Sequence, residues 1–174
     1  MEAEDQIINK VANSALITFN LEEYYQPGER VVLDIKDQLY QQLILREKDF
    51  RDFIKSHDWQ QYANKFVAVT CSADAIVPTW AYMLVAIALQ PHAKKVVFGS
   101  LQDLETILFH EQLSKINWSS FKNAKVVVKG CSKVDVPVSV YIEATNHLKP
   151  FVSSMMFGEP CSTVPLYKKS KKEE

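Results

Sequence analysis

The three cysteines of this 174-residue chain stand in similar sequence surroundings. Cys71 occurs in VTCSADAIVP, Cys131 in KGCSKVDVP and Cys161 in EPCSTVP, so each is followed by a serine and, a few residues later, by Val-Pro. Thiolates attack electrophiles and bind soft metal ions. The shared pattern therefore predicts a site that the three thiols form together, although a favourable turn from strand to helix would also explain it.

Three thiolates at one place suit a small number of chemistries. They can hold zinc, with Asp74, a histidine or water as the fourth ligand. They can also hold three irons of a four-iron cluster, or transfer sulfur as thiols or persulfides. No two of the cysteines have the Cys-x-x-Cys spacing of zinc ribbons and thioredoxin-like proteins. The sequence favours a metal or iron-sulfur site at Cys71, Cys131 and Cys161 without choosing the metal.

Several residues next to the cysteines are predicted to support this site. They are Ser72, Asp74, Lys129, Ser132, Glu159 and Ser162. The serines can cap a helix or donate hydrogen bonds to a sulfur or a bound anion. Lys129 would add positive charge, whereas Asp74 also fits a helix cap and Glu159 a solvent-facing position.

An internal repeat predicts the elements that position the cysteines. Residues 59–99 align with residues 118–158: Cys71 matches Cys131 at a spacing of 60, and Pro78 matches Pro137 at a spacing of 59. Each copy reads as a buried strand, a cysteine-containing turn, a helix that starts near Val-Pro, and a second strand. Cys161 lies outside this match, so duplication accounts for two of the three cysteines.

The remaining segments complete an α/β pattern. We expect strands in residues 14–20 and 28–35, and helices in residues 43–59 and 101–116. This order predicts a mainly parallel sheet with helices on both faces, built around two tandem βαβ copies in one domain over residues 1–167, with a charged tail over 168–174. Ligands bind at the carboxyl ends of such strands, where all three cysteines are expected beside helix N-termini that stabilise thiolates.

Composition and charge limit the partners. A formal net charge of -1 gives no excess of positive charge for binding nucleic acid. The acidic N-terminus has no apolar signal region, which predicts a cytoplasmic protein, and the longest apolar run is too short to span a membrane. The helix expected within that run, residues 76–89, is apolar on nearly every face. It therefore predicts a homodimer, in which a second subunit covers the helix.

Longer strings of residues resemble a known family. They are ALITFNLEEYY, GERVVLDIKD, LILREKDFR, TCSADAIVPTWAYML, KGCS, VPVSVY and GEPCSTVPLYK, which together cover nearly the whole chain. The chain resembles the bacterial domain-of-unknown-function family 2480. This family has no assigned activity, and the resemblance implies an association with sulfur mobilisation and iron-sulfur assembly components.

Three classes of function follow from these observations. The first is a metal or iron-sulfur site of the three cysteines that serves iron-sulfur cluster assembly or sulfur handling, with assembly proteins as partners. The second is an enzyme with one nucleophilic cysteine, in which helix N-termini hold a small anionic substrate. The third is a structural or interaction protein with inert thiols. No nucleotide-binding glycine motif and no Ser-His-Asp elbow is present, so the sequence identifies no catalytic residues.

Overall fold

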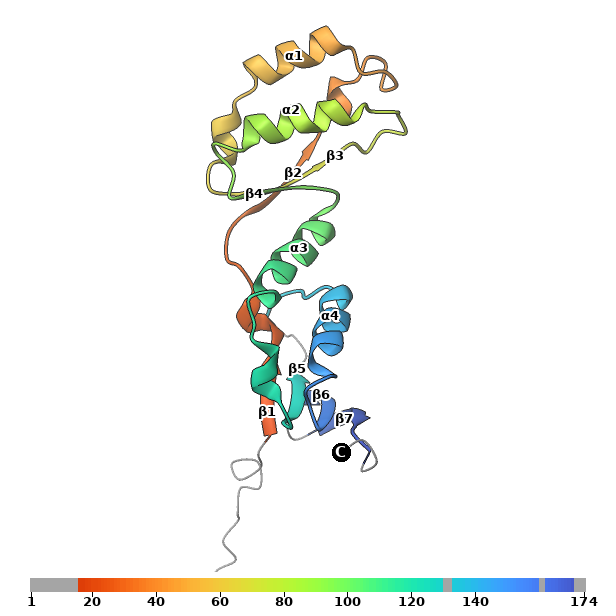
Figure 1. Ribbon diagram of the computed structural model, residues 1–174. Helices are drawn as coiled ribbons and strands as arrows, with labels where there is room; N and C mark the ends of the chain where they lie inside the picture. The colour runs from red at the N-terminus through yellow and green to blue at the C-terminus, as the bar shows by residue number, and fades with distance from the viewer. Residues whose placement is uncertain (1–15, 130–132, 160–161, 171–174) are drawn as a thin grey trace, which may run out of the picture. The chain divides into compact units, whose positions relative to one another are not determined.

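A computed structural model describes residues 16–129, 133–159 and 162–170 (Figure 1). The predicted α/β class is confirmed, since helices alternate with mainly parallel strands. The strands form two sheets, however, where the sequence predicted one. The chain divides accordingly into two compact units: a split unit, Met1–Tyr25 with His110–Glu174, and a continuous unit, Gln26–Phe109. The single domain over residues 1–167 stays a prediction, because one domain can contain two such units.

The continuous unit has a three-stranded parallel sheet. Its strands are β2 (Arg30–Asp34), β3 (Phe66–Thr70) and β4 (Lys95–Phe98), in the order β2-β3-β4. The helices that belong to it are α1 (Glu47–Ser56), α2 (Thr79–Leu89) and the first part of α3 (Leu101–Leu113). Short 3-10 helices, η2 (Lys36–Gln38) and η3 (Trp59–Tyr62), lie before α1 and β3.

The central strand β3 is covered on both faces. Val67 and Val69 pack with α1 and α2, whereas Phe66 and Ala68 pack with Leu104 of α3. Successive side chains of a strand point to opposite faces, so a run of consecutive apolar residues packs against the helices on both faces of the sheet. Full burial of each large side chain contributes about 1.5–3 kcal/mol, which is why this short apolar strand forms the centre of the unit.

The split unit has a four-stranded sheet. Its strands are β1 (Leu16–Asn20), β5 (Lys125–Lys129), β6 (Ser154–Glu159) and β7 (Ser162–Lys168), in the order β1-β5-β6-β7. The first three are parallel and β7 is antiparallel to β6. This unit also contains α4 (Val138–Leu148), η1 (Leu21–Tyr24) and η4 (Trp118–Phe121). The sequence did not predict β7, which contains a proline and lies at the edge of the sheet, where proline is tolerated.

Local contacts in the two units recur 59 residues apart. Asn64 and Asn123 both have a φ of 61° and both precede a strand. The Asn64 N–H donates to the His92 carbonyl oxygen at 3.0 Å, and the Asn123 N–H donates to the Phe151 carbonyl oxygen at 2.8 Å. The helices α2 and α4, and the strands β4 and β6, begin at the same spacing. Among the helices in the described part of the chain, none has the length and apolar character needed to cross a membrane.

Candidate functional site

Cys71 lies at the carboxyl end of the central strand of the continuous unit. It directly follows β3, is not in a disulfide, and has a partly exposed side chain. Its Sγ lies 3.9 Å from the carbonyl oxygen of Ala73, a contact at the long end of the range for a thiol donor. Part of the side chain packs against the core beneath α1 and α2. The thiol is therefore held in place by its neighbours but is open to reagents from one side.

A carboxylate holds the segment after Cys71. Asp34 ends β2, and its Oδ1 accepts hydrogen bonds from the backbone N–H groups of Ser72 at 3.1 Å and Lys36 at 3.0 Å. The Ser72 hydroxyl donates to Asp34 Oδ2 at 2.5 Å. Burial by itself would raise the pKa of Asp34, but the hydrogen bonds from Ser72 and Lys36 outweigh it and lower the pKa below its ordinary value. Asp34 is thus an ionised clamp between two parallel strands.

The aromatic ring of Tyr82, on α2, contacts that of Phe98, at the end of β4. Their rings are 4.9 Å apart and meet edge to face at 75°. Burial raises the pKa of the Tyr82 hydroxyl, and the negative charges of Cys71 and Asp34 raise it further. The carboxyl edge of the sheet therefore brings a thiol, a carboxylate and a phenol within electrostatic range of one another.

The serine and acid after Cys71 differ from the predicted roles. Ser72 was expected to cap a helix or to bind sulfur or an anion, but its hydroxyl donates to Asp34. The helix α2 begins later, at Thr79, with Pro78 at its N-cap and no side-chain cap. Asp74 is exposed and lies too far before Thr79 to cap the helix. Cys71 is consequently separated from the helix by a loop, where the sequence predicted a position beside the helix N-terminus.

Three predicted residues of the split unit, Lys129, Glu159 and Ser162, lie at strand ends. Lys129 ends β5 and Glu159 ends β6, and the Lys129 Nζ lies 3.7 Å from Glu159 Oε1. The side chain of Glu159 is 56% exposed, as a solvent-facing position predicts. Ser162 begins β7 opposite Glu159 and is exposed. Cys131, Ser132 and Cys161 lie outside the described residues. The positive charge expected from Lys129 is thus partly offset by Glu159.

A second carboxylate contacts the loop that follows Cys131 in the sequence. The Lys133 backbone N–H donates to Glu22 Oε1 at 2.7 Å. Glu22 belongs to η1, which begins after Asn20 at the end of β1, and the Asn20 side chain accepts from the Glu22 N–H at 3.2 Å. In each unit, an acidic residue at or just after the end of the first strand therefore binds a backbone N–H after the cysteine. Sequence reasoning missed both Asp34 and Glu22, because neither stands near a cysteine in the sequence.

Replacing Asp34 by asparagine is expected to lower the free energy of unfolding by about 1–2 kcal/mol at neutral pH, because charge-assisted hydrogen bonds are lost. The folded pKa is depressed, so this stabilisation is present above the ordinary aspartate pKa of 3.8 and disappears as the pH falls through the folded value. Urea unfolding at neutral and acid pH measures the difference between the variant and the natural protein. Asp37→Asn, in the same turn and exposed, is the control; equal losses for both variants at neutral pH would contradict the clamp.

The described residues alone do not contain a complete set of metal ligands. No group of three or more His, Cys, Asp or Glu side chains within residues 16–129, 133–159 and 162–170 is arranged to hold an ion. Two of the three predicted ligands, Cys131 and Cys161, lie outside those ranges. Both carboxylate oxygens of Asp34 already accept hydrogen bonds, so Asp34 positions the loop. Of the predicted ligands, the partly exposed thiol of Cys71 is the donor that the structure describes.

One family model matches the chain. It covers residues 5–169 and has the description "Protein of unknown function (DUF2480)". No curated protein and no solved structure matches the chain.

Proposed function

Because the chain belongs to the DUF2480 family of proteins of unknown function, we propose a role from the site itself: iron-sulfur cluster assembly or sulfur handling through cysteine thiols. The observation that carries this proposal is the position of Cys71. Its thiol is partly exposed at the carboxyl edge of a parallel sheet, on a loop that Asp34 holds in place. Such edges are where ligands bind in open α/β sheets.

Thiolates are the ligands that zinc and iron-sulfur clusters prefer. A bound cluster or zinc ion would have the cysteines as ligands and would supply metal or sulfide for transfer. The prediction that all three cysteines form one site stays a prediction. A reducing cytoplasmic location, in which thiols remain free, belongs to the same proposal.

The sheet of the split unit supports joint action of Cys131 and Cys161. Cys131 comes two residues after Lys129, and Cys161 two residues after Glu159. These two side chains form an ion pair at 3.7 Å between the ends of neighbouring strands. Cys131 and Cys161, which lie outside the described residues, thus follow the ends of two neighbouring strands in the sequence.

The charge near Cys71 favours a metal cation over a small anionic substrate. Asp34 lies beside Ser72 with both oxygens hydrogen-bonded and a lowered pKa, so it is negatively charged at neutral pH. The Lys36 Nζ lies 3.7 Å from Asp34 Oδ2 and offsets part of this charge. A carboxylate attracts a metal cation and repels an anion, which supports the metal-binding form of the first class of function.

Metal and acid-labile sulfide analysis, with a visible absorption spectrum, tests the proposal on protein purified without oxygen. We expect iron with sulfide, or zinc, in a fixed ratio to protein. Cys71→Ser, Cys131→Ser and Cys161→Ser are each expected to lose most of it, because a serine hydroxyl is a poor ligand for soft metals. Ser56→Ala, which changes the exposed last residue of α1 and keeps every thiol and every predicted supporting residue, is the control and should retain the metal.

Thiol labelling separates the other two classes of function. Metal-free protein in which one cysteine reacts much faster than the others would support a nucleophilic enzyme. Metal-free protein in which every cysteine reacts slowly would support a structural or interaction role. Either result would contradict the proposed metal or iron-sulfur site.

We also propose that the two units arose by duplication of one βαβ unit. The left-handed Asn64 and Asn123 and their hydrogen bonds support this, since they recur at the same spacing. The strands β1 and β2 support it as well, because Asn20 and Asp34 each end one of them. The side chain of each accepts a hydrogen bond from the backbone N–H two residues later, that of Glu22 and that of Lys36. The duplicated unit would then include a strand before each of the two aligned segments.

A further inference from the structure

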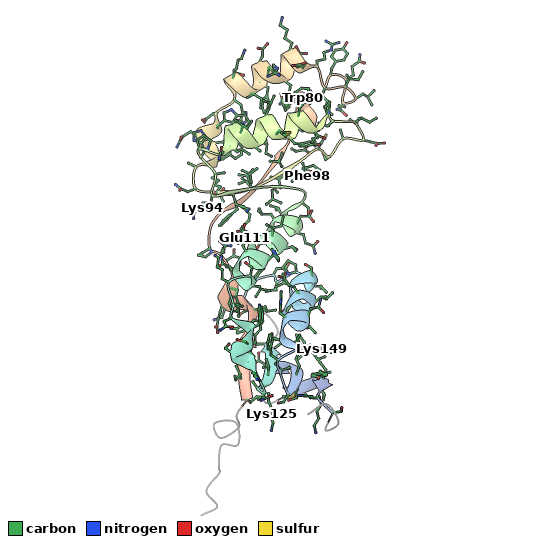
Figure 2. All side chains as sticks on the ribbon, in the orientation of Figure 1. Trp80, Lys94, Phe98, Glu111, Lys125 and Lys149 are labelled. Carbon is green, nitrogen blue, oxygen red and sulfur yellow. The ribbon has the colours of Figure 1, made fainter. Side chains whose placement is uncertain are left out.

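The strand β4 is an edge of the continuous unit with an apolar surface beside it. Within the described residues, β3 is its strand partner, on one side. Phe98 of β4, which Figure 2 labels, is 66% exposed. Met83 and Ile87 of α2 are 60% and 64% exposed. Large apolar side chains that gather beside the edge of a sheet mark an interaction surface.

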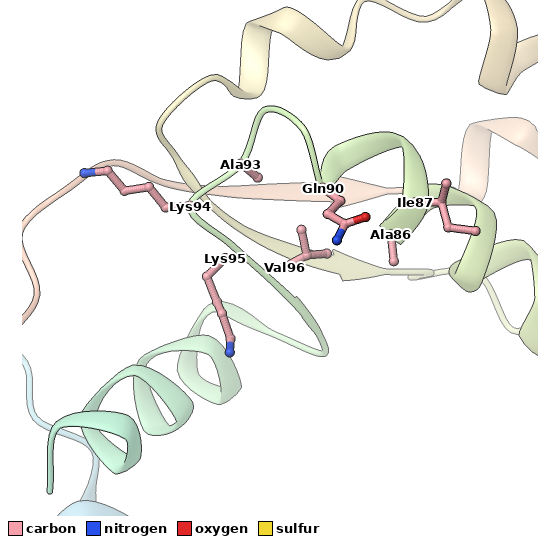
Figure 3. Close-up of a pocket in the computed structure, with 7 residues that line it drawn as sticks. All are labelled: Ala86, Ile87, Gln90, Ala93, Lys94, Lys95 and Val96. Atoms are coloured by element: carbon pink, nitrogen blue, oxygen red, sulfur yellow. The ribbon is translucent and has the colours of Figure 1, made fainter. Parts of the chain in front are cut away.

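A hollow runs between α2 and this edge. Its volume is about 520 Å³, and it is lined by Ala86 and Ile87 of α2, by Gln90 just after that helix and by Val96 of β4, with Lys94 and Lys95 at one end (Figure 3). The Lys94 Nζ lies 5.5 Å from the centre of the Phe66 ring, and Phe66 packs on the α3 face of the sheet. The hollow between α2 and β4 is therefore mainly apolar. It is accessible to a further β-strand that pairs with β4.

At the corresponding edge of the split unit, a further strand is present and shows how such an edge is covered. There, 59 residues later, β6 is paired with the antiparallel strand β7. Tyr167 of β7 lies opposite Met155, the counterpart of Val96, and Met155 is fully buried. Phe157, the counterpart of Phe98, is 39% exposed. An antiparallel strand that places an aromatic ring opposite the second residue of the edge strand thus covers this kind of edge.

We propose that β4 of a second copy of this chain covers the edge, in an antiparallel pair around a twofold axis. With Val97 opposite its own copy, Phe98 lies opposite Val96 of the second copy. This matches the position of Tyr167 opposite Met155 in the split unit. Val97 packs on the α3 face, so its neighbours Val96 and Phe98 point to the α2 face. The twofold pairing is self-complementary, as a closed dimer requires.

The same pairing accounts for the apolar character of α2. An axis perpendicular to the sheet keeps both α2 helices on one face, next to each other. Met83 and Ile87 are one helical turn apart and both are exposed, so they form an apolar stripe along α2. The dimer buries this stripe together with Phe98. The interface is thus built from backbone hydrogen bonds of β4 and apolar contacts of α2.

Sedimentation velocity of the full chain over a range of concentrations tests the dimer, in the presence of a reductant so that no disulfide links the copies. The natural protein is expected to be a dimer. Met83→Glu is expected to weaken the dimer at least about 100-fold, because it buries an unpaired charge. The matched control is Ile142→Glu on α4, the position 59 residues later. Its side chain is 58% exposed and its unit already has β7 at the edge, so the dimer should be unchanged.

Both substituted side chains are exposed, so the circular dichroism of each variant should equal that of the natural protein. Ile87→Glu is a second variant in case Met83→Glu unfolds, and it should dissociate the dimer in the same way. A natural protein that stays monomeric at every concentration would overturn the proposal. So would a dimer that persists in both α2 variants, or one that Ile142→Glu dissociates. None of these outcomes depends on metal content, so the test is independent of the cysteine function.

Discussion

Replacing Phe50 by alanine is expected to lower the free energy of unfolding by about 3–5 kcal/mol. Phe50 is fully buried on α1, and its ring lies 5.6 Å from that of Phe53 and 6.0 Å from that of Trp80 on α2. Removal of the ring loses its transfer free energy and leaves a cavity between the two helices. Since a domain is stable by only about 5–15 kcal/mol, the variant should unfold at a much lower urea concentration, as measured by tryptophan fluorescence.

Leu43→Ala is the control for this substitution. Leu43 lies in the same unit, and its side chain is 60% exposed. Its truncation should change the unfolding free energy by less than about 1 kcal/mol. If the two variants lost similar amounts of unfolding free energy, the contact between α1 and α2 would not be a main source of this unit's stability.

Replacing Gly158 by alanine is expected to cost about 3 kcal/mol or more, and to separate β7 from β6. Gly158 has a φ of 122°, which residues with a side chain rarely adopt. A Cβ there would lie 2.6 Å from the Ser162 carbonyl oxygen, and a backbone atom of a paired strand cannot move without breaking the pair. Urea unfolding measures the cost, and amide hydrogen exchange of residues 162–168 reports the release of β7.

Gly99→Ala is the matched comparison, since Gly99 lies 59 residues earlier with a φ of 133°. A Cβ there would lie 2.6 Å from Asp103 Oδ2, which can rotate away, and 2.9 Å from Asp103 Cβ, which can move only with the first turn of α3. The cost should still be measurable, because Asp103 binds the Ser100 backbone N–H and hydroxyl, each at 2.7 Å. A larger loss for Gly99→Ala than for Gly158→Ala would contradict the role given to the β6 and β7 contact.

The local elements were predictable from the sequence because their signals are local. β3 and β5 are short runs of valine and other apolar residues, and both helices that follow begin just after a proline. The choice of strand partner is different. β1 pairs with β5, and β2 pairs with β3, although β1 and β2 are adjacent in the sequence. No local pattern distinguishes these pairings from a single sheet, so the sequence predicted one sheet where there are two.

The candidate site was predictable in part for the same reason. Cys71 and the serine after it stand out by composition and by their repeated surroundings. Asp34 stands far from them in the sequence and reaches Ser72 only because β2 pairs with β3. The hydroxyl and N–H of Ser72 donate to Asp34 because its carboxylate, a strong acceptor, lies within reach.

The insertion of the continuous unit within the split unit has a consequence for synthesis on the ribosome. Gln26–Phe109 is one unbroken stretch, and all of its strand partners emerge before residue 110. The strand β1 emerges earlier than any of them but pairs with β5, at the other end of the inserted stretch. Contacts between segments that are far apart in the sequence form slowly, because the chain between them must first be closed into a loop. The continuous unit can therefore form first during synthesis, while β1 waits for β5, which is made only after the whole inserted stretch.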